Sequence, residues 1–411
     1  MRNTINQWRK FCTDKMIFES VDPRTIEKIE TTISRYGGKS FIVGGAVRDE
    51  LNPDSPASKD IDFIITGLPL EKIARILTPL GKVDEVGKSF GIVKATIDGE
   101  EFDFALPQAA ETKTGEKHTD FEVVTDHNLP VEDDLARRDF TINAMAKDSD
   151  GNIIDQFGGQ EDLQNKIIRA VGDPHERFSE DPLRILRALQ FATRFGFTIE
   201  PETAQAIRDL KNLLHSISSE RIYAEFAKAW TKGKADTQTL VYWLKNLGIG
   251  EELFGSDFQP VAINMPGGFD EKIIGNFIAF FLYGGNPEMV RPTNNMSKYL
   301  KVAQALVGGT NYIFKIVGRD TDTLPLILQA FDQIAASSGN QELADTIDEL
   351  KISMTLPMLP KELAVTGNDL MQAGLSGREI GKAMQDILIA IHDRTIDNEK
   401  EQILDFLDEH D

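Results

Sequence analysis

Two aspartates separated by one residue lie in an apolar stretch of the chain, DIDFII at residues 60–65. Alternate side chains of a strand share a face, so Asp60 and Asp62 are expected to point together while Ile61 and Phe63 face the core. Two carboxylates on one face repel each other unless a cation lies between them. A divalent metal such as Mg²⁺, which takes hard oxygen ligands, answers that need. For such a pair in isolation, a solvated strand end or a turn cap is the more ordinary interpretation.

A double glycine precedes this pair and offers a place for a phosphate. Gly44 and Gly45 stand between an apolar strand and a short predicted helix, AVRDEL. Backbone without a Cβ lets a phosphate approach, amides at a helix start favour an anion, and Arg48 is expected to add a charge-assisted contact. Asp103 in EEFDFALP is a third strand carboxylate, although a solvent-facing residue is its ordinary interpretation. Together these residues are the minimal equipment for two-metal phosphoryl transfer.

The elements that must hold these residues are predicted from the hydrophobic pattern. Residues 40–146 alternate short β-rich runs with turns, and Asp98-Gly99 indicates a hairpin that makes two strands neighbours. Helices are expected in LEKIARIL and where Ile26, Ile29 and Ile33 recur at helical spacing. The pattern predicts a small mixed sheet with helices.

Beyond residue 159 the β signals fade and the chain is predicted to be almost wholly helical. The predicted fold class is therefore α+β, with a head built on the small mixed sheet followed by an all-α neck, body and tail. Glycine- and proline-bearing breaks suggest the domain edges, and the expected domains are 1–150, 151–260, 261–355 and 356–411.

The composition argues against a generally basic nucleic-acid binder. The 411 residues include 45 Lys and Arg against 66 Asp and Glu, a formal net charge of −21. Any nucleic acid must therefore be bound through local basic clusters or metal cations. The N-terminus lacks the apolar core of a signal peptide, Cys12 is the single cysteine, and no apolar run is long enough to span a bilayer. We expect a cytoplasmic protein with no membrane partner.

GGAVRD followed by KDIDF resembles the head-domain signature of the nucleotidyltransferase superfamily. Specifically, it is similar to class II tRNA nucleotidyltransferases (CCA-adding enzymes) and to bacterial poly(A) polymerases. The resemblance continues, in the family's order and spacing, through ARRDFTINAMA, DGNIIDQFGGQEDL, EDPLRILRALQFATRFGF and SERIYAEFAKAW. It implies an enzyme that adds C, C and A to the 3′ end of tRNA from CTP and ATP without a nucleic-acid template and releases pyrophosphate. The implied partners are tRNA lacking all or part of its CCA end, CTP, ATP and Mg²⁺, with no haem or organic cofactor.

The resemblance implies roles for two further blocks. In RRDFT, the residues alone predict surface arginines before a capped apolar helix at 140–146. The resemblance implies that Arg138 reaches the triphosphate or sugar and that Asp139 helps distinguish ribose. By the same resemblance, Asp60, Asp62 and Asp103 are catalytic, and the first two hold the metal.

In EDPLR, Pro182 suits the first turn of a helix, so the residues alone predict Asp181 as its N-cap. The resemblance implies that Asp181 and Arg184 present an acceptor and a donor fork to the Watson–Crick edge of CTP or ATP. Arg187, further along that face, would add positive charge toward the triphosphate.

Two positions depart from the family pattern. The family usually has arginine three residues after Arg187 and after the ALP of the third-carboxylate strand, where this chain has Gln190 and Gln108. Both departures remove a cation expected near nucleotide or RNA. They predict weaker nucleotide binding or altered selectivity unless neighbouring residues compensate.

Other segments favour one branch of the family. The polar segment 109–128 matches the mobile loop that full CCA enzymes use when switching from C to A, although an ordinary long hairpin fits it equally well. Its full length disfavours a CC-only enzyme. Ser89, where the poly(A) branch shows a second basic residue, disfavours a poly(A) polymerase. A-only addition and a silent RNA-binding protein are the remaining alternatives, the latter disfavoured by the metal carboxylates.

The tail segment 362–384 is similar to the tail of bacterial CCA enzymes. The resemblance implies that Gly377 and the helix start after it meet tRNA phosphate through backbone amides, with Lys382 nearby. A plain helix cap is the ordinary alternative. Some relatives carry a metal phosphohydrolase domain, but the tail offers only His392-Asp393 as ligands, so we expect no such domain.

Overall fold

The computed structural model describes residues 21–52, 61–84, 91–108, 112–113, 121–122, 125–308 and 324–410. The chain divides into two compact units, Met1–Ile249 and Gly250–Asp411. Within the described ranges, no helix combines the length and the apolarity that a membrane crossing requires. The division into four domains stays a prediction.

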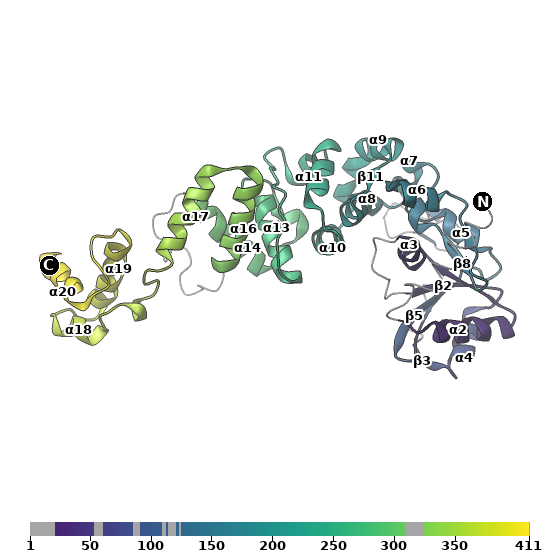
Figure 1. Ribbon diagram of the computed structural model, residues 1–411, viewed down its shortest axis with the longest axis horizontal. Coiled ribbons are helices and arrows are strands. Elements are labelled where there is room, and N and C mark those ends of the chain that lie inside the picture. Colours follow the sequence, from purple (N-terminus) through teal and green to yellow (C-terminus); the bar gives the residue numbers. More distant parts are fainter. Residues whose placement is uncertain are drawn as a thin grey trace, which may run out of the picture. The chain divides into compact units, whose positions relative to one another are not determined.

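A seven-stranded sheet organises the first unit (Figure 1), in the order β3-β4-β5-β2-β1-β8-β9. The strands are β1 (Lys39–Val43), β2 (Ile61–Thr66), β3 (Gly81–Asp84), β4 (Ile92–Ile97), β5 (Glu100–Ala105), β8 (Ala146–Asp148) and β9 (Ile153–Ile154). β2 and β5 are parallel, whereas the other neighbours are antiparallel. The sheet is therefore mixed, and the predicted α+β class is confirmed.

The Asp98-Gly99 turn fixes the pairing of β4 with β5. Ile97 lies opposite Glu100, so the turn has two residues, and both have positive φ (52° and 90°). Two-residue hairpins favour this backbone because its twist matches that of the strands. The predicted hairpin is confirmed.

Apolar residues of the first unit fill the space between the sheet and its helices. Helices α2 (Pro23–Arg35) and α4 (Leu70–Leu77) lie against each other and against β1 and β4. The predicted helical face of Ile26, Ile29 and Ile33 is buried, as expected. A second cluster joins the strands to α5 (Val131–Ala136) and contains Phe41, Val43, Ile64, Val131, Leu135, Ala144, Ala146 and Val171.

The helix predicted at 140–146 does not form. The chain instead makes a short 3₁₀ turn, η2 (Thr141–Asn143), and enters β8 at Ala146. Ala146 pairs with Val43 on one side and with Ile154 on the other, so its backbone is part of the sheet. Tertiary pairing has overridden a local helical pattern here.

Helices dominate the remainder of the first unit. Their bounds are α3 (Gly45–Leu51), α6 (Gly159–Asn165), α7 (Pro174–Glu180), α8 (Leu183–Phe195), α9 (Pro201–Leu210), α10 (Ser219–Thr231) and α11 (Thr237–Asn246). A short parallel pair, β10 (Ile167–Ile168) with β11 (Thr198–Ile199), departs from the all-helical expectation. α8 packs against both α10 and α11.

The loop that follows β5 is described only in part. Gln108 makes an isolated antiparallel bridge with Thr125. Between them, β6 (Thr112–Lys113) pairs with β7 (Phe121–Glu122). This pairing agrees with the hairpin interpretation of the segment; most of the loop, like Ser89, lies outside the described residues.

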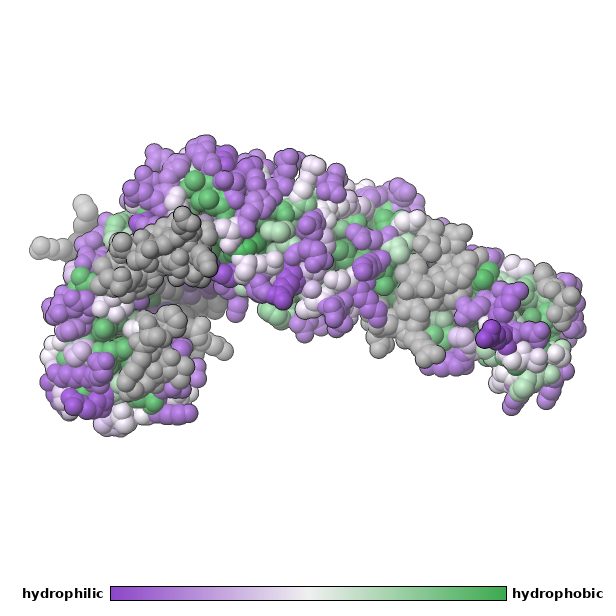
Figure 2. Space-filling view, turned by 180° about the vertical axis from the view of Figure 1, so that it is seen from behind, coloured by the Kyte–Doolittle hydropathy of each residue, from purple (hydrophilic) through white to green (hydrophobic). Residues whose placement is uncertain are grey.

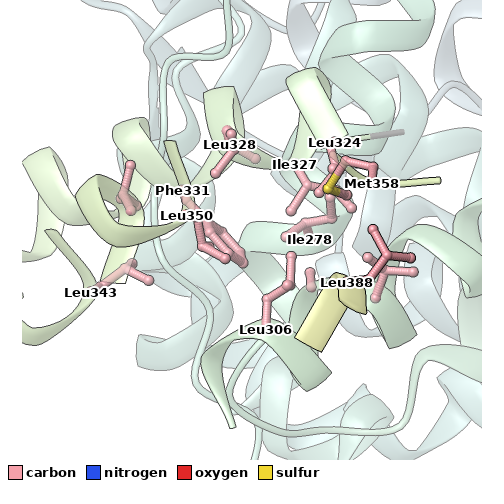
Figure 3. Packing of buried hydrophobic residues seen from close by; sticks show 14 of the residues in the cluster. Ile278, Leu306, Leu324, Ile327, Leu328, Phe331, Leu343, Leu350, Met358 and Leu388 are labelled. Carbon is pink, nitrogen blue, oxygen red and sulfur yellow. The ribbon is translucent and has the colours of Figure 1, made fainter. Parts of the chain in front are cut away.

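The second unit is helical and has its own core (Figure 3). Its helices are α12 (Ile249–Phe254), which begins at the boundary between the units, α13 (Phe269–Phe281), α14 (Asn294–Val307), α16 (Leu324–Ser338), α17 (Gln341–Ser353), α18 (Gly367–Gln372), α19 (Arg378–His392) and α20 (Lys400–His410). Side chains from seven of them, α13 to α20, meet in the core, among them Ile278, Leu306, Phe331, Leu350 and Leu388. On the face drawn in Figure 2, hydrophilic residues dominate and hydrophobic ones are scattered among them.

Candidate active site

Three charged residues form a row on one face of the sheet where β2, β5 and β4 run side by side. Asp62 of β2 is the register partner of Asp103 in β5, and Asp103 is the register partner of Lys94 in β4. Register partners leave a sheet on the same face. Lys94 Nζ lies 2.9 Å from both Asp103 Oδ1 and Asp103 Oδ2. We call these three residues the acid row.

Buried aromatic residues hold the acid row in place. Phe63, Phe102 and Phe104 alternate with the aspartates and are at most 1% exposed, whereas Asp62 is exposed. The rings of Phe63 and Phe104 stack with their centroids 5.2 Å apart. The predicted alternation of Asp62 with buried neighbours is thus confirmed; its expected companion Asp60 lies outside the described residues.

The donor chemistry of the acid row fits a divalent metal. Asp62 and Asp103 present carboxylate oxygens, which are the hard donors that Mg²⁺ prefers. Adjacent carboxylates also favour a cation between them. No group of three or more His, Cys, Asp and Glu among the described residues could hold a metal. Further ligands must therefore come from water, from a substrate or from residues outside the described ranges, of which Asp60 is the expected one.

A glycine turn begins beside the acid row. β1 ends at Val43, the register partner of Asp62, and Gly44 follows with a φ of +68° as the N-cap of α3. A Cβ added to Gly44 would lie 2.6 Å from Arg138 Nη1, and one added to Gly45 would come no closer than 3.4 Å to another side chain. Position 44 therefore needs glycine both for its backbone conformation and for the approach of Arg138.

Arg48, which was expected to contact phosphate, is enclosed. It is 3% exposed, and its Nε donates to Asp49 Oδ1 at 2.8 Å. Its Nη1 donates to Asn143 Oδ1, and its guanidinium carbon lies 4.8 Å from the centroid of Phe195. Burial lowers the pKa of this guanidinium, and the charge of Asp49 opposes that shift. A direct contact with phosphate would require the guanidinium to leave these partners.

Asp139 and Arg187 form an ion pair whose carboxylate is buried. Arg187 Nε donates to Asp139 Oδ2 at 2.7 Å, and Arg187 Nη2 lies 2.6 Å from the same oxygen. Asp139 Oδ1 accepts from the Phe140 amide at 2.8 Å and from Asn143 Nδ2 at 3.0 Å. Burial by itself would raise the pKa of the Asp139 carboxyl, but the charge of Arg187 and these hydrogen bonds together lower it. Both oxygens of the residue expected to recognise ribose thus have protein partners.

Asn143 connects these two groups, because its side chain bonds to Arg48 at one end and to Asp139 at the other. We call the whole set the buried network: Arg48, Asp49, Asp139, Asn143 and Arg187.

Sequence reasoning missed three residues of the site: Asn143, Asp134 and Lys94. Asp134 is fully buried, and its two oxygens accept from Arg137 Nη2 and Arg138 Nη2 at 2.9 Å each. Its spacing of three and four residues from those arginines was a usable signal. Asn143 meets Arg48 across 95 residues, so no local pattern could indicate the contact.

Lys94 could have been found from the hairpin. The Asp98-Gly99 turn pairs Ile97 with Glu100, and Lys94 and Asp103 lie three residues to either side of that pair. A two-residue turn therefore places the lysine opposite the third carboxylate.

The two expected base-selecting residues lie at the start of α8. Asp181 is the C-cap of α7, and the N-cap of α8 is Pro182. The predicted N-cap, Asp181, is therefore wrong by one residue. The fixed φ of proline lets Pro182 take a helical conformation there (φ −58°), while Asp181 is extended. The Asp181 carboxylate still accepts from the Leu183 amide at 3.2 Å and lies 3.3 Å from Arg221 Nη2.

Arg184 contacts the turn that carries Arg137 and Arg138. Its Nη2 donates to the Arg137 carbonyl at 2.9 Å, and its Nη1 donates to Glu180 Oε2 at 2.9 Å. Together with the Arg187–Asp139 pair, these contacts bring the start of α8 to the same turn that touches Gly44.

Gln190, one of the two departures from the family pattern, lines a small cavity between α8, α10 and α11. Apart from Gln190 and Glu225, the side chains that line it are apolar. Among the described residues, Gln190 Nε2 and Glu225 Oε2 find no hydrogen-bond partner, whereas Glu225 Oε1 accepts from Lys228 Nζ at 2.9 Å. An arginine at position 190 would bring a cation toward the unpartnered oxygen.

The two expected RNA-binding residues belong to the second unit. Gly377 precedes α19 with a φ of +55°, and both Gly377 and Lys382 are exposed. The Ser376 amide beside them donates to Glu379 Oε2 at 3.0 Å. All other expected site residues that the structure describes lie in the first unit.

Three family models match separate parts of the chain. Residues 40–169 match a model described as the poly A polymerase head domain, and 196–248 match one described as the probable RNA and SrmB-binding site of polymerase A. Residues 323–407 match domain 2 of tRNA nucleotidyltransferases.

Similar proteins match most of the chain. The chain is 31% identical over 401 residues to a CCA-adding enzyme of Bacillus licheniformis, covering 92% of this chain and 95% of the relative. It is 30% identical to a CCA-adding enzyme of Levilactobacillus brevis, covering 90% and 93%. A Bacillus stearothermophilus CCA-adding enzyme in complex with CTP has a similar fold, with a TM-score of 0.64 at 24% identity and coverage of 95% and 98%. The Thermotoga maritima CCA-adding enzyme complexed with tRNA has a TM-score of 0.65 at 21% identity, with coverage of 96% and 98%.

Proposed function

The chain belongs to the family of CCA-adding enzymes, and from this premise we propose that it completes the 3′ end of tRNA by adding C, C and A from CTP and ATP. Its substrates are then tRNA lacking all or part of that end and the two nucleotides, and pyrophosphate is released. An enzyme of this kind works where tRNA is present, which favours a cytoplasmic location.

The observation that carries the proposal is the acid row beside the glycine turn. Two carboxylates, Asp62 and Asp103, leave one face of the sheet next to the point where β1 gives way to Gly44. Family membership implies a divalent metal, and we propose Mg²⁺, held by Asp62 with Asp60. Such an ion, when bound, supplies charge neutralisation and activation of the tRNA hydroxyl.

The residues of this chain then have separate tasks. Asp103 lies where it could accept the proton of the attacking 3′-hydroxyl, because its side chain leaves the sheet beside Asp62. Gly44 and Gly45 keep side chains away from the turn, so the triphosphate can approach its backbone. Arg138, whose Nη1 lies against Gly44, is the cation best placed to contact that phosphate chain.

The buried network keeps this surface in shape. Arg48 ties α3 to Asn143, and Asn143 in turn orients Asp139. We propose that Arg48 acts on the phosphates through this support. Asp139 and Arg187 would serve ribose and triphosphate from the exposed edge of their pair, since the Arg187 side chain is 33% exposed.

Base selection is proposed for Asp181 and Arg184. The Asp181 side chain is 35% exposed and offers a carboxylate acceptor, and Arg184 offers the donor fork of its guanidinium. The contacts of Arg184 with Glu180 and the Arg137 carbonyl fix the plane of that fork. A fixed acceptor and donor at the start of α8 could discriminate cytosine and adenine by their hydrogen-bonding edges.

Gly377 and Lys382 are proposed to bind tRNA phosphates, a contact that suits every tRNA regardless of sequence.

Extension of a tRNA that lacks its 3′ end tests this function. The purified protein with Mg²⁺ receives CTP alone, ATP alone, or both, and the products are resolved at single-nucleotide length. We expect two additions with CTP and a third only when ATP is also present, and no addition by the Asp62→Asn variant. A long ladder with ATP alone would identify a poly(A) polymerase, arrest after CC a partial enzyme, and binding without extension a silent RNA-binding protein.

A further inference from the structure

Lys94 stands at the end of the acid row, and the function proposed above gives it no role. Its ammonium lies 2.9 Å from each oxygen of Asp103, so one cation bridges the whole carboxylate. The hydrogen bond to Asp103 and the charge of Asp103 raise the pKa of Lys94, with smaller contributions from Glu101 and Asp62. The lysine therefore bonds to Asp103 and shares a face of the sheet with Asp62.

This contact conflicts with the chemistry proposed for Asp103. A carboxylate whose two oxygens both accept from an ammonium is a poor proton acceptor and a poor metal ligand, because Lys94 already supplies the positive charge. The pair is also accessible, since the side chains of Lys94 and Asp103 are 61% and 36% exposed. Exposed ion pairs are weak, and a divalent cation can compete with them.

A purely structural role explains the pair poorly. The Asp98-Gly99 turn already fixes the register of β4 on β5. Val93 and Phe104 are buried on the opposite face and anchor both strands. Loss of an exposed ion pair would change little in such a hairpin.

We propose that Lys94 is a tethered cation that occupies Asp103 in the metal-free enzyme and competes with the divalent metal for this carboxylate. The proposal rests on the proposed function and extends it, because it requires that Asp103 join Asp62 in binding the metal. Without metal, the lysine relieves the repulsion between Asp62 and Asp103. When the metal is bound, the lysine must release at least one oxygen of Asp103. The lysine therefore raises the metal concentration that is needed to occupy the site.

Metal binding without any substrate tests the proposal. Mn²⁺, a paramagnetic substitute for Mg²⁺, is titrated into the full-length protein and the free ion is measured by electron paramagnetic resonance. The variants are Lys94→Met, which keeps the length of the side chain without its charge, and Lys94→Arg, which keeps the charge. Lys82→Met, an exposed lysine on neighbouring strand β3, is the matched control.

Removing a competing exposed ion pair should tighten Mn²⁺ binding by about two- to tenfold in Lys94→Met. Lys94→Arg and Lys82→Met should bind within about twofold of the wild type. Equal or weaker binding by Lys94→Met, in a variant with an unchanged urea unfolding curve, would overturn the proposal. The double variant Asp62→Asn/Asp103→Asn separates the two hypotheses: if it binds Mn²⁺ as the wild type does, the acid row is not the metal site and the proposed function loses its central support as well.

Discussion

The acid row and the buried network both consist mainly of charged residues of the first unit, yet they differ in whether the protein itself supplies all the partners of those residues. In the row, Asp62 is exposed, and the Asp103 side chain, which Lys94 contacts, is 36% exposed. In the network, Arg48 is 3% exposed and Asp139 8%, and both oxygens of Asp139 have protein partners. The acid row is accessible to a ligand, whereas in the buried network the protein itself supplies the partners of the Asp139 carboxylate.

This difference separates chemistry from support. An exposed carboxylate row loses little folding energy when it is altered, because water already screens it. A buried ion pair that loses one partner leaves an uncompensated charge in the interior, which is costly. Substitutions in the row should therefore affect the reaction, while substitutions in the network should affect folding first.

The largest effect on stability is expected at Arg187. In Arg187→Met, Asp139 keeps its burial but loses the charge that compensates it, so the free energy of unfolding should fall by about 3–5 kcal/mol. Urea unfolding followed by circular dichroism measures this. The control is Arg221→Met, whose side chain is 53% exposed and lies 3.3 Å from Asp181, and which should cost less than about 1 kcal/mol. Similar losses for the two variants would erase the distinction drawn above.

A smaller effect is expected at Gly44. Gly44→Ala must adopt a φ of +68° and would bring its Cβ to 2.6 Å from Arg138 Nη1. Such backbone strain costs about 1–3 kcal/mol. Gly45→Ala is the matched control, since its nearest contact would be 3.4 Å away. The same unfolding measurement should find Gly45→Ala close to the wild type, and equal losses at both positions would refute the argument.

A substitution at Gln190 is expected to raise the stability of the fold. Gln190→Arg places a guanidinium in the cavity beside the unpartnered Glu225 Oε2, and a hydrogen bond to a charged group should stabilise the fold by about 1–2 kcal/mol. Gln190→Met fills similar space without a donor and should bring no gain. Thermal unfolding of the three proteins compares them; a lower midpoint for Gln190→Arg would mean that the cavity cannot admit the longer side chain.

The last effect is a pH dependence restricted to acidic solutions. The pKa of Asp139 is lowered in the folded protein, so its ion pair contributes fully above the unfolded pKa of about 3.9 and is lost as the pH falls through the folded pKa. The difference in unfolding free energy between the wild type and Asp139→Asn should therefore shrink below about pH 4. A difference that stays constant down to pH 2 would show that the carboxylate is not stabilised by Arg187.

The sequence was most informative where local rules apply. Alternation predicted which face Asp62 would take, and the Asp98-Gly99 turn predicted that β4 and β5 are neighbours. The helix of LEKIARIL begins and ends at the residues expected. These features depend on residues a few positions apart, so a single sequence contains them.

It was least informative where distant segments meet. Arg48 was expected to face phosphate, but Asp49, Asn143 and Phe195 enclose it, and two of these lie far along the chain. The helix expected at 140–146 became a 3₁₀ turn and a strand because β1 and β9 pair with Ala146. No pattern within a short window reports such contacts.

The most direct test compares one aspartate from each region in the same preparation. Asp103→Asn and Asp139→Asn are measured for unfolding free energy in urea and for metal-dependent incorporation of CTP into tRNA that lacks its 3′ end. We predict that Asp103→Asn loses about 10²–10⁴-fold in incorporation rate, as expected for a lost proton acceptor, with an unfolding free energy within about 1 kcal/mol of the wild type. Asp139→Asn should lose several kcal/mol of unfolding free energy, on the order of 3 kcal/mol. If Asp103→Asn instead unfolds the protein, or keeps the wild-type rate, the acid row is not the place where the chemistry occurs.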